Sequence, residues 1–273
     1  AWNWEDATYK EDMGVHLNWP NLYRFTGWWA EPGPIENNKD YDKYVGEIKN
    51  LFDEAKAYCA GGHSTTNLKL EAMCGLFDGS KKLFANVNII KEIIDVVNFA
   101  QEYGVDVVIV GGDDAWMCTD ILKQYDIPVM INKTRNLPSR KDEDYDLPYK
   151  LPKILQDAGV LYCLTPGQGS GFWDMRNLPF DAGIAVAHGL TKEEALMSLT
   201  SNSAKILGID KTVGTLEVGK DATLIVSKGD ILDMMTSHVE QAFIRGRMVD
   251  MENKQKALYR RFMDKYDLEH QQH

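Results

Sequence analysis

Two adjacent carboxylates, Asp113 and Asp114, are the residues of this 273-residue sequence whose spacing most directly suggests chemistry. They follow two glycines and the apolar run 105–110, which is typical of a buried strand. Paired carboxylates at the end of a strand suit a hard divalent cation. Alternatively, they are the N-cap and the first-turn acid of the next helix, facing the positive end of its dipole. Both interpretations stay open at this point.

Arginine and histidine side chains offer a second kind of chemistry, the binding of a polar or anionic small molecule. Arg135, Arg140 and Arg176 lie in expected loops, where a guanidinium can hold a carboxylate through two hydrogen bonds, although solvation at the surface is the alternative. His16 lies in the aromatic-rich stretch 1–35, which we expect to be an ordered loop region. The candidate pocket residues are His16, Asn86, Asn88, Asp113, Asp114, Arg135, Asp174 and Arg176.

Composition narrows the classes of protein to consider. The hydrophobic share of 44% and the charged share of 26% are typical of a globular chain. No apolar run reaches the length of about eighteen residues that predicts a membrane span. A net charge of −11 argues against a general nucleic-acid binder. We therefore expect a soluble protein whose partner is a small molecule, with no nucleic-acid or membrane partner. A homo-oligomer and the cellular compartment are left open.

The four cysteines, Cys59, Cys74, Cys118 and Cys163, include no CxxC pair, which argues against a zinc ribbon or a thioredoxin-type site. We expect them to be single buried thiols. The start of the chain at Ala1 is not a signal peptide and lacks an initiator Met. We therefore expect that an N-terminal portion has been removed or left out.

The elements that must position these residues alternate between strands and helices from residue 82 onward. Such alternation implies a parallel sheet. Four βα units in succession form either half of an eight-stranded barrel or one doubly wound sheet. The predicted strands are 82–87, 105–110, 127–131 and 160–164, and the predicted helices are 40–58, 68–77, 89–103, 115–124, 149–158 and one that begins near Leu178.

The C-terminal part has a different period. A capping box at Thr191 and Glu194 predicts a helix that runs to Leu207 and ends at Gly208. Alternating patterns then predict short strands at 212–218, 222–226 and 241–249, of which the last two should pair outside the main sheet. Residues 253–266 have the pattern of a charged amphipathic helix, followed by a tail expected to fray.

Several runs of residues resemble the amidohydrolase superfamily. Glu194–Gly208 is similar to its final barrel helix, Val213–Val226 to the strand that returns into a small β-sandwich, and Gln241–Val249 to the last strand of that sandwich. Three shorter motifs resemble imidazolonepropionase-like members. These motifs are Gly14-Val-His-Leu-Asn-Trp-Pro20, Leu137-Pro-Ser-Arg140 and Arg176-Asn-Leu-Pro-Phe180.

The resemblance implies an α/β fold, namely the second half of a (β/α)8 TIM-type barrel plus the C-terminal strands of a small β-sandwich. Residues 1–208 would form the barrel domain, with βα units 5–8 from about residue 82 after a loop and helices. Residues 209–252 would form the sandwich part, and residues 253–273 a C-terminal helix and tail. The first half-barrel, with its His-x-His strand, would precede Ala1.

Amidohydrolases use one or two divalent metal ions, usually zinc, at the carboxyl ends of the barrel strands. The positions that match two ligand histidines and the ligand aspartate hold Asn86, Gly111 and Pro166 here. These residues offer at most one weak amide oxygen, so we predict no metal or other cofactor in this chain. Asp113 and Asp114 could replace the missing ligands, but would hold a harder ion only loosely.

The resemblance implies a hydrolase that acts on C–N bonds, in a cyclic amide or another non-peptide or small peptide-like substrate. No catalytic residue is assigned. Two alternatives belong to other classes. The protein is then either a catalytically inactive relative that binds a small molecule, or a subunit completed by a separate half-barrel chain.

Overall fold

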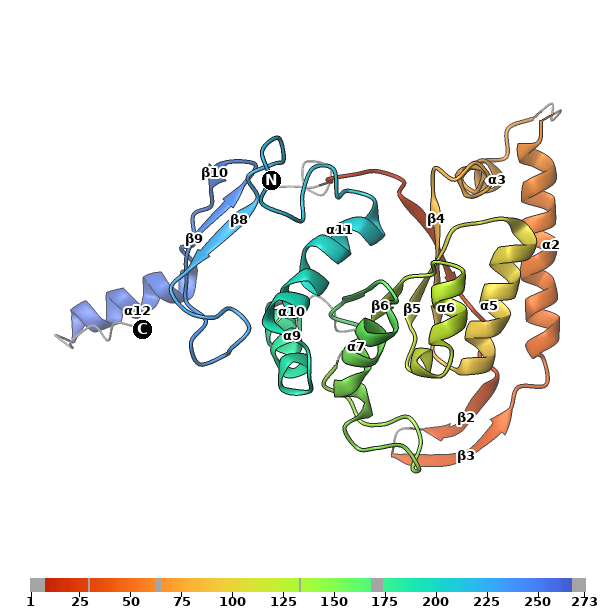
Figure 1. The fold of residues 1–273 in the computed structure, drawn as a ribbon, viewed down its shortest axis with the longest axis horizontal. Coiled ribbons are helices and arrows are strands. Elements are labelled where there is room, and N and C mark those ends of the chain that lie inside the picture. Colours follow the sequence, from red (N-terminus) through yellow and green to blue (C-terminus); the bar gives the residue numbers. More distant parts are fainter. Residues whose placement is uncertain (1–7, 29, 62–64, 133, 168–173, 267–273) are drawn as a thin grey trace. The chain divides into compact units, whose positions relative to one another are not determined.

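The computed structural model describes residues 8–28, 30–61, 65–132, 134–167 and 174–266. The chain divides after Thr215 into two compact units (Figure 1). Unit 1, which ends at Thr215, holds an α/β fold with a parallel sheet. Unit 2, from Leu216 onward, holds a small antiparallel sheet and a helix.

A five-stranded sheet, parallel between every pair of neighbours, forms the centre of unit 1. The four strands predicted from the sequence are confirmed as parallel neighbours in chain order. That order has no reversal, unlike a doubly wound sheet. The spatial order is β1 (Gly14–Asn18), β4 (Lys82–Val87), β5 (Val107–Gly111), β6 (Val129–Ile131) and β7 (Tyr162–Leu164).

The N-terminal stretch differs from the expected loop. Gly14–Asn18 forms the edge strand β1, and His16 lies opposite Phe84 of β4. Tyr23–Trp28 (β2) and Glu31–Asn37 (β3) form an antiparallel hairpin. In β1 only two apolar residues, Val15 and Leu17, alternate with polar ones. Because this run is short and lies among Trp, Asn and Pro residues, its alternation does not predict a strand.

Helices follow the sheet strands as the sequence predicts. Gly104 ends α5 in the left-handed conformation, with φ 67°, where a glycine is the least strained residue. The helices of unit 1 are α2 (Tyr41–Cys59), α3 (Leu68–Glu71), α4 (Cys74–Phe77), α5 (Ile90–Tyr103), α6 (Thr119–Gln124), α7 (Leu147–Ala158), α9 (Leu178–Ala187), α10 (Lys192–Leu199) and α11 (Ser201–Leu207), with 3-10 turns η1 (Ala115–Met117) and η2 (Met175–Asn177).

Both faces of β4 to β7 are largely buried, as expected when helices cover a parallel sheet, whereas His16 and Asn18 of the edge strand β1 are exposed. On one face Phe84, Val108 and Cys163 from three strands pack with Ile206 of α11. On the flank shown in Figure 1, α2 and α5 lie side by side, and the ring of Phe52 contacts that of Phe99 with centroids 4.7 Å apart. The sheet therefore sits in a core that fixes the carboxyl ends of its strands.

The predicted helix after residue 191 begins as expected but is interrupted. Thr191 and Glu194 form the capping box, with the Glu194 amide donating to the Thr191 hydroxyl at 3.2 Å. The helix breaks at Thr200, whose φ of −119° and ψ of −88° are not helical, so two helices replace one. The Thr200 hydroxyl donates to the Leu196 carbonyl, the kind of side-chain bond that competes with helical bonding.

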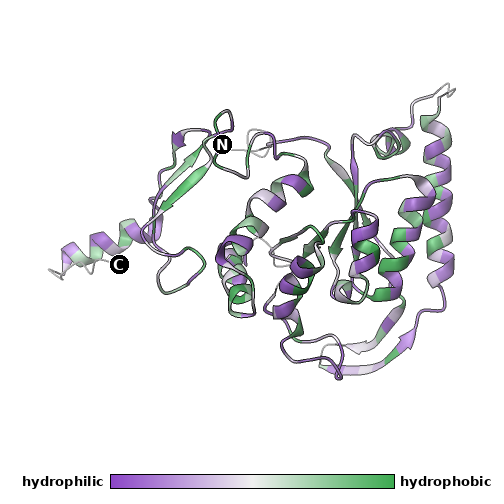
Figure 2. Cartoon of the chain, viewed as in Figure 1, coloured by the Kyte–Doolittle hydropathy of each residue, from purple (hydrophilic) through white to green (hydrophobic). Residues whose placement is uncertain are grey.

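Unit 2 contains the predicted pairing outside the main sheet. Leu224–Ser227 (β8) pairs antiparallel with Val239–Ile244 (β9), which also pairs with Arg247–Met248 (β10). The predicted strand 212–218 is wrong, because this segment contains turns, bends and irregular backbone but no strand. Lys254–Lys265 (α12) confirms the C-terminal helix, and Figure 2 shows both apolar and strongly polar residues along it. The tail, 267–273, lies outside the described residues.

The expectation for the cysteines is only half right. Cys118 and Cys163 are free and buried, but Cys59 and Cys74 form a disulfide between the end of α2 and the start of α4. Sequence spacing gave no sign of it, since the pairing depends on how two helices pack. Within the described ranges, no helix combines the length and apolar character needed to cross a membrane.

Candidate functional site

The carboxyl ends of β1 and β4 bring two amide side chains together. Asn18 and Asn86 are partners in the parallel register, and the Asn86 Nδ2 donates to the Asn18 Oδ1 at 2.9 Å. His16 lies two residues before Asn18, so it shares a face of the sheet with it. The His16 ring stacks on Phe84, with centroids 5.0 Å apart. The structure thus groups two of the predicted residues, His16 and Asn86, on one face.

Asn88 lies directly beyond β4 and contacts the end of β5. Gly111 has a φ of 102°, a conformation that side-chain-bearing residues rarely adopt. A Cβ placed on Gly111 would lie 2.1 Å from the Asn88 Oδ1. Any larger residue at Gly111 would therefore displace Asn88, and the two positions are coupled.

The residues at the three expected metal-ligand positions do not fit a metal ion. The amide of Asn86 is engaged with Asn18, and the space beside Gly111 is occupied by Asn88. Pro166 has no donor atom in its side chain. Among the described residues, no group of three or more His, Cys, Asp or Glu side chains is arranged to hold an ion. A zinc site normally needs three or four such donors.

Asp113 and Asp114 differ sharply in their surroundings. The Asp114 carboxylate is buried and accepts hydrogen bonds from the Ile90 amide at 3.0 Å and from the Arg140 Nη1 at 2.9 Å. It therefore caps the first turn of α5, the neighbouring helix, and makes no cap bond to its own turn. Burial, and next the charge of Asp114, raise the pKa of the Asp113 carboxyl above its ordinary value.

The other predicted residues belong to different groups of contacts. Arg135 forms an ion pair with Asp181 of α9, whose side chain is buried. Arg176 is exposed in η2, and Asp174 is the N-cap of the same turn. Arg135 also lines a pocket of about 450 Å³, together with Asn136, Leu137, Tyr149, Ile184 and His188.

A larger groove of about 860 Å³ begins at the end of β1. Asn18 lines it and also bonds to Asn86, so the groove and the paired amides are adjacent. Its walls come from the β2–β3 hairpin and from α2, and they carry aromatic, amide and charged groups. The lining residues are Asn18, Trp19, Pro20, Asn21, Tyr23, Arg24, Phe25, Asn38, Asp40, Tyr44, Glu47, Ile48 and Leu51.

Sequence reasoning missed three polar residues at the strand ends, namely Asn18, Asn132 and Thr165. The Thr165 hydroxyl, after β7, donates to the Asn132 Oδ1, after β6, at 3.2 Å. Each of the three is the last residue of a short strand or follows one directly. The rule that parallel strands share a carboxyl edge would have identified Asn132 and Thr165. Asn18 could be identified in the same way only if β1 were first recognised as a strand.

The paired amides, Asn18 and Asn86, can both donate hydrogen bonds to a neutral polar molecule and accept them from it. An amide side chain presents one carbonyl oxygen and two N–H donors. The side chains that meet between β1 and β4, Asn18 and Asn86, carry no charge. Asp114 and Arg140 bond to each other, whereas Arg24, Asp40 and Glu47 line the groove that adjoins Asn18. Recognition of an uncharged polar group is therefore the chemistry that the two paired amides supply.

Comparison with known proteins identifies the relatives of the chain. The sequence model of the amidohydrolase family matches residues 173–251. The imidazolonepropionase of Fusobacterium nucleatum is 27% identical over 107 residues, which is 37% of this chain and 26% of that protein. The imidazolonepropionase of Flavobacterium psychrophilum is 28% identical over 110 residues, 38% of this chain and 27% of that protein. The matched segment thus spans about a quarter of these curated relatives.

Solved structures show the same fold. An amidohydrolase from Thermotoga maritima has a TM-score of 0.73 at 24% identity, covering 91% of this chain and 65% of its own. A prolidase complexed with N-methylphosphonate-L-proline has a TM-score of 0.50 at 17% identity, covering 66% of this chain and 48% of its own. The family match and the two relatives thus make the chain similar to the amidohydrolase family and, within it, to imidazolonepropionases.

Proposed function

We propose that this chain is part of a hydrolase that acts on a C–N bond in a small, uncharged polar molecule such as a cyclic amide. The observation that carries the proposal is the pair Asn18 and Asn86 at the carboxyl ends of β1 and β4, beside the groove. In barrel enzymes this end of the strands holds the substrate. The family of the chain supports the reaction class, and the amides support a carbonyl- and N–H-bearing substrate.

In this proposal the five parallel strands are consecutive strands of a (β/α)8 barrel, and the sheet of unit 2 is part of a β-sandwich. The chain supplies contacts to the substrate, while the metal ligands are other than Asn86, Gly111 and Pro166. These three residues do not fit an ion, so no chemical step is assigned to them.

A second candidate function is a catalytically inactive relative that binds a small molecule at the same edge. The close approach of Asn88 to Gly111 favours it, because a ligand histidine could not enter there without displacing Asn88. A third possibility, that this chain is a subunit completed by a separate half-barrel chain, stays a prediction.

The full-length protein, purified without chelator, separates the two functions. Elemental analysis measures its divalent metal, and a panel of cyclic amides and imides measures hydrolysis before and after chelation. Hydrolysis that requires metal supports the hydrolase. Binding of panel compounds by calorimetry, without metal or turnover, supports the inactive relative instead.

The paired amides are tested with Asn86→Ala and with Asn98→Ala, an exposed asparagine on α5, as the control. Loss of one hydrogen bond to substrate should raise KM or Kd about tenfold in the first variant only. Equal behaviour of both variants would place the substrate elsewhere.

A further inference from the structure

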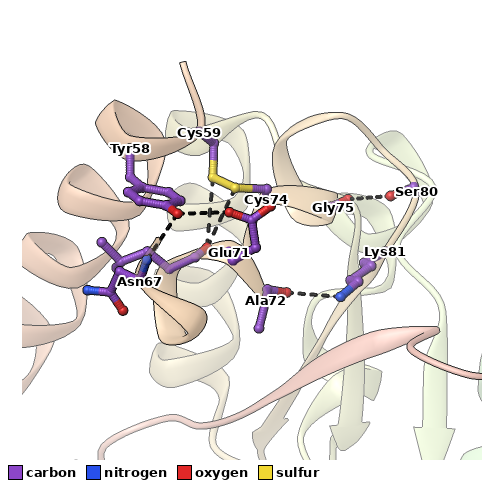
Figure 3. Close-up of a disulfide and its surroundings, with 10 residues drawn as sticks. Tyr58, Cys59, Asn67, Glu71, Ala72, Cys74, Gly75, Ser80 and Lys81 are labelled. Atoms are coloured by element: carbon purple, nitrogen blue, oxygen red, sulfur yellow. Dashed lines mark hydrogen bonds between the residues drawn. A yellow bond between two sulfur atoms is a disulfide. The ribbon is translucent and has the colours of Figure 1, made fainter. Parts of the chain in front are cut away.

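The Cys59–Cys74 disulfide closes a loop around a segment with little core of its own. The bridge joins the last residue of α2 to the first residue of α4, with Cα atoms 5.4 Å apart (Figure 3). Within the described part of the enclosed segment, only Leu70 and Met73 are buried, whereas Leu68 is 79% exposed. Apolar burial therefore holds this segment weakly, and the covalent bond provides a constraint that the core does not.

Exposed hydrogen bonds also hold the described residues of the segment. The Tyr58 hydroxyl donates to Glu71 at 2.9 Å and accepts from the Asn67 amide at 3.1 Å, as Figure 3 shows. Lys81 donates to the Ala72 carbonyl at 3.0 Å. Exposed bonds of this kind contribute little net stability because water competes for both partners. Without the bridge, the segment would open locally far more often than the rest of unit 1.

The other two cysteines cannot take part in redox chemistry from the folded state. Cys118 and Cys163 are 4% and 2% exposed. Burial raises the pKa of the Cys118 thiol to about 11 and that of Cys163 to about 12, so neither forms the reactive thiolate near neutral pH. Cys59 and Cys74, by contrast, are each partly exposed, so reductants could reach the bridge.

We infer that this protein matures and acts in an oxidising compartment, outside a glutathione-reduced cytosol, where Cys59 and Cys74 are held as a structural disulfide. A partly exposed bridge in a reducing cytosol would be opened by thiol exchange. Its formation needs a disulfide oxidoreductase. The two thiols lose two protons and two electrons, and the disulfide of that protein accepts them and becomes a dithiol. The inference does not depend on the proposed hydrolase activity.

Thiol trapping on the full-length protein in its native cells tests the compartment. Cells are quenched in acid, fractionated and alkylated, and the protein is digested and analysed by mass spectrometry. We expect a peptide linked through Cys59 and Cys74 in the fraction outside the cytosol, and alkylation of Cys118 and Cys163 only after unfolding. Alkylated Cys59 and Cys74, or a bridged protein confined to the cytosol, would overturn the inference.

Limited proteolysis tests the structural role in the same protein. Reduction of the bridge should speed tryptic cleavage after Lys69 about tenfold or more, since the loop loses its closure. A Cys118→Ala, Cys163→Ala variant should respond to the reductant in the same way, and a Cys59→Ala, Cys74→Ala variant should be cleaved fast with or without it. If the latter variant fails to fold, the reduced wild type still gives the result. A cleavage rate that does not change when the bridge is reduced would contradict the structural role of the disulfide.

Discussion

Asp114 joins three segments of unit 1 through one carboxylate. It accepts from the first amide of α5 and from Arg140 in the loop after β6. Asp114→Ala should lower the free energy of unfolding by about 2 kcal/mol, combining a lost helix cap with a half-exposed ion pair. Urea unfolding measures the change. Asp120→Ala, at an exposed position of α6, is the control and should be close to neutral. A neutral Asp114→Ala would mean that the carboxylate is not needed for the fold.

Glu92 links the stability of unit 1 to pH. Its carboxylate accepts from the Leu22 amide at 2.6 Å, and burial raises its pKa above the ordinary value of 4.5. An acid with a raised folded pKa binds more protons in the folded state, so its effect on stability becomes unfavourable as pH rises from 4.5 through the folded pKa.

Glu92→Gln keeps an acceptor for Leu22 and removes this titration. In urea unfolding between pH 4 and about pH 7, the wild type should lose stability relative to Glu92→Gln as pH rises. Glu54→Gln, at an exposed position of α2, should follow the wild type. A difference between wild type and Glu92→Gln that is constant across this range would refute the raised pKa.

The candidate site was predictable only in part, because its residues depend on contacts between segments distant in sequence. Asp113 and Asp114 stand out locally, yet Asp114 bonds to Ile90 and Arg140, which periodicity cannot reveal. Asn86 stands out in the sequence as a departure from the family pattern, but its partner Asn18 does not, because the sequence of β1 predicts a loop.

Thr191 shows how a local pattern fixes the start of α10. The capping box is complete, with the Thr191 amide donating to the Glu194 carboxylate at 2.8 Å. Thr191→Ala should lower the free energy of unfolding by about 1 kcal/mol, because the Glu194 amide loses the hydroxyl oxygen that accepts its hydrogen bond. Glu193→Ala, in the same turn and exposed, should change it by a few tenths. Equal effects in thermal unfolding would argue against the capping role.

Elements with strong local signals were the predictable ones. β4 has the predicted bounds, and α5 begins and ends within a residue of the prediction, since a buried apolar run and a C-terminal glycine define them. The failures lie where a local pattern competes with a tertiary one. Thr200 interrupts a helix that its sequence favours, and residues 212–218 form no strand despite an alternating pattern.

Unit 2 differs from unit 1 in how little of it is buried. Among its described residues, the only buried hydrophobic side chain is Leu232, whereas Ile225, Val226 and Ile244 of its sheet are 43–57% exposed. A three-stranded sheet with so little apolar burial cannot offset the entropy of ordering its chain. We therefore expect unit 2 to be unstable when it is produced on its own.

The corresponding prediction is that residues 216–273 produced alone do not fold, whereas the same residues within the full-length protein do. Amide chemical shifts of the isolated segment should be poorly dispersed, and its circular dichroism should change gradually with temperature, as in a chain without a cooperative core. Selective labelling in the full-length protein should show slow hydrogen exchange at the β8–β9 amides, such as those around Ala242. A cooperative thermal transition of the isolated segment would show that a core beyond Leu232 exists within it.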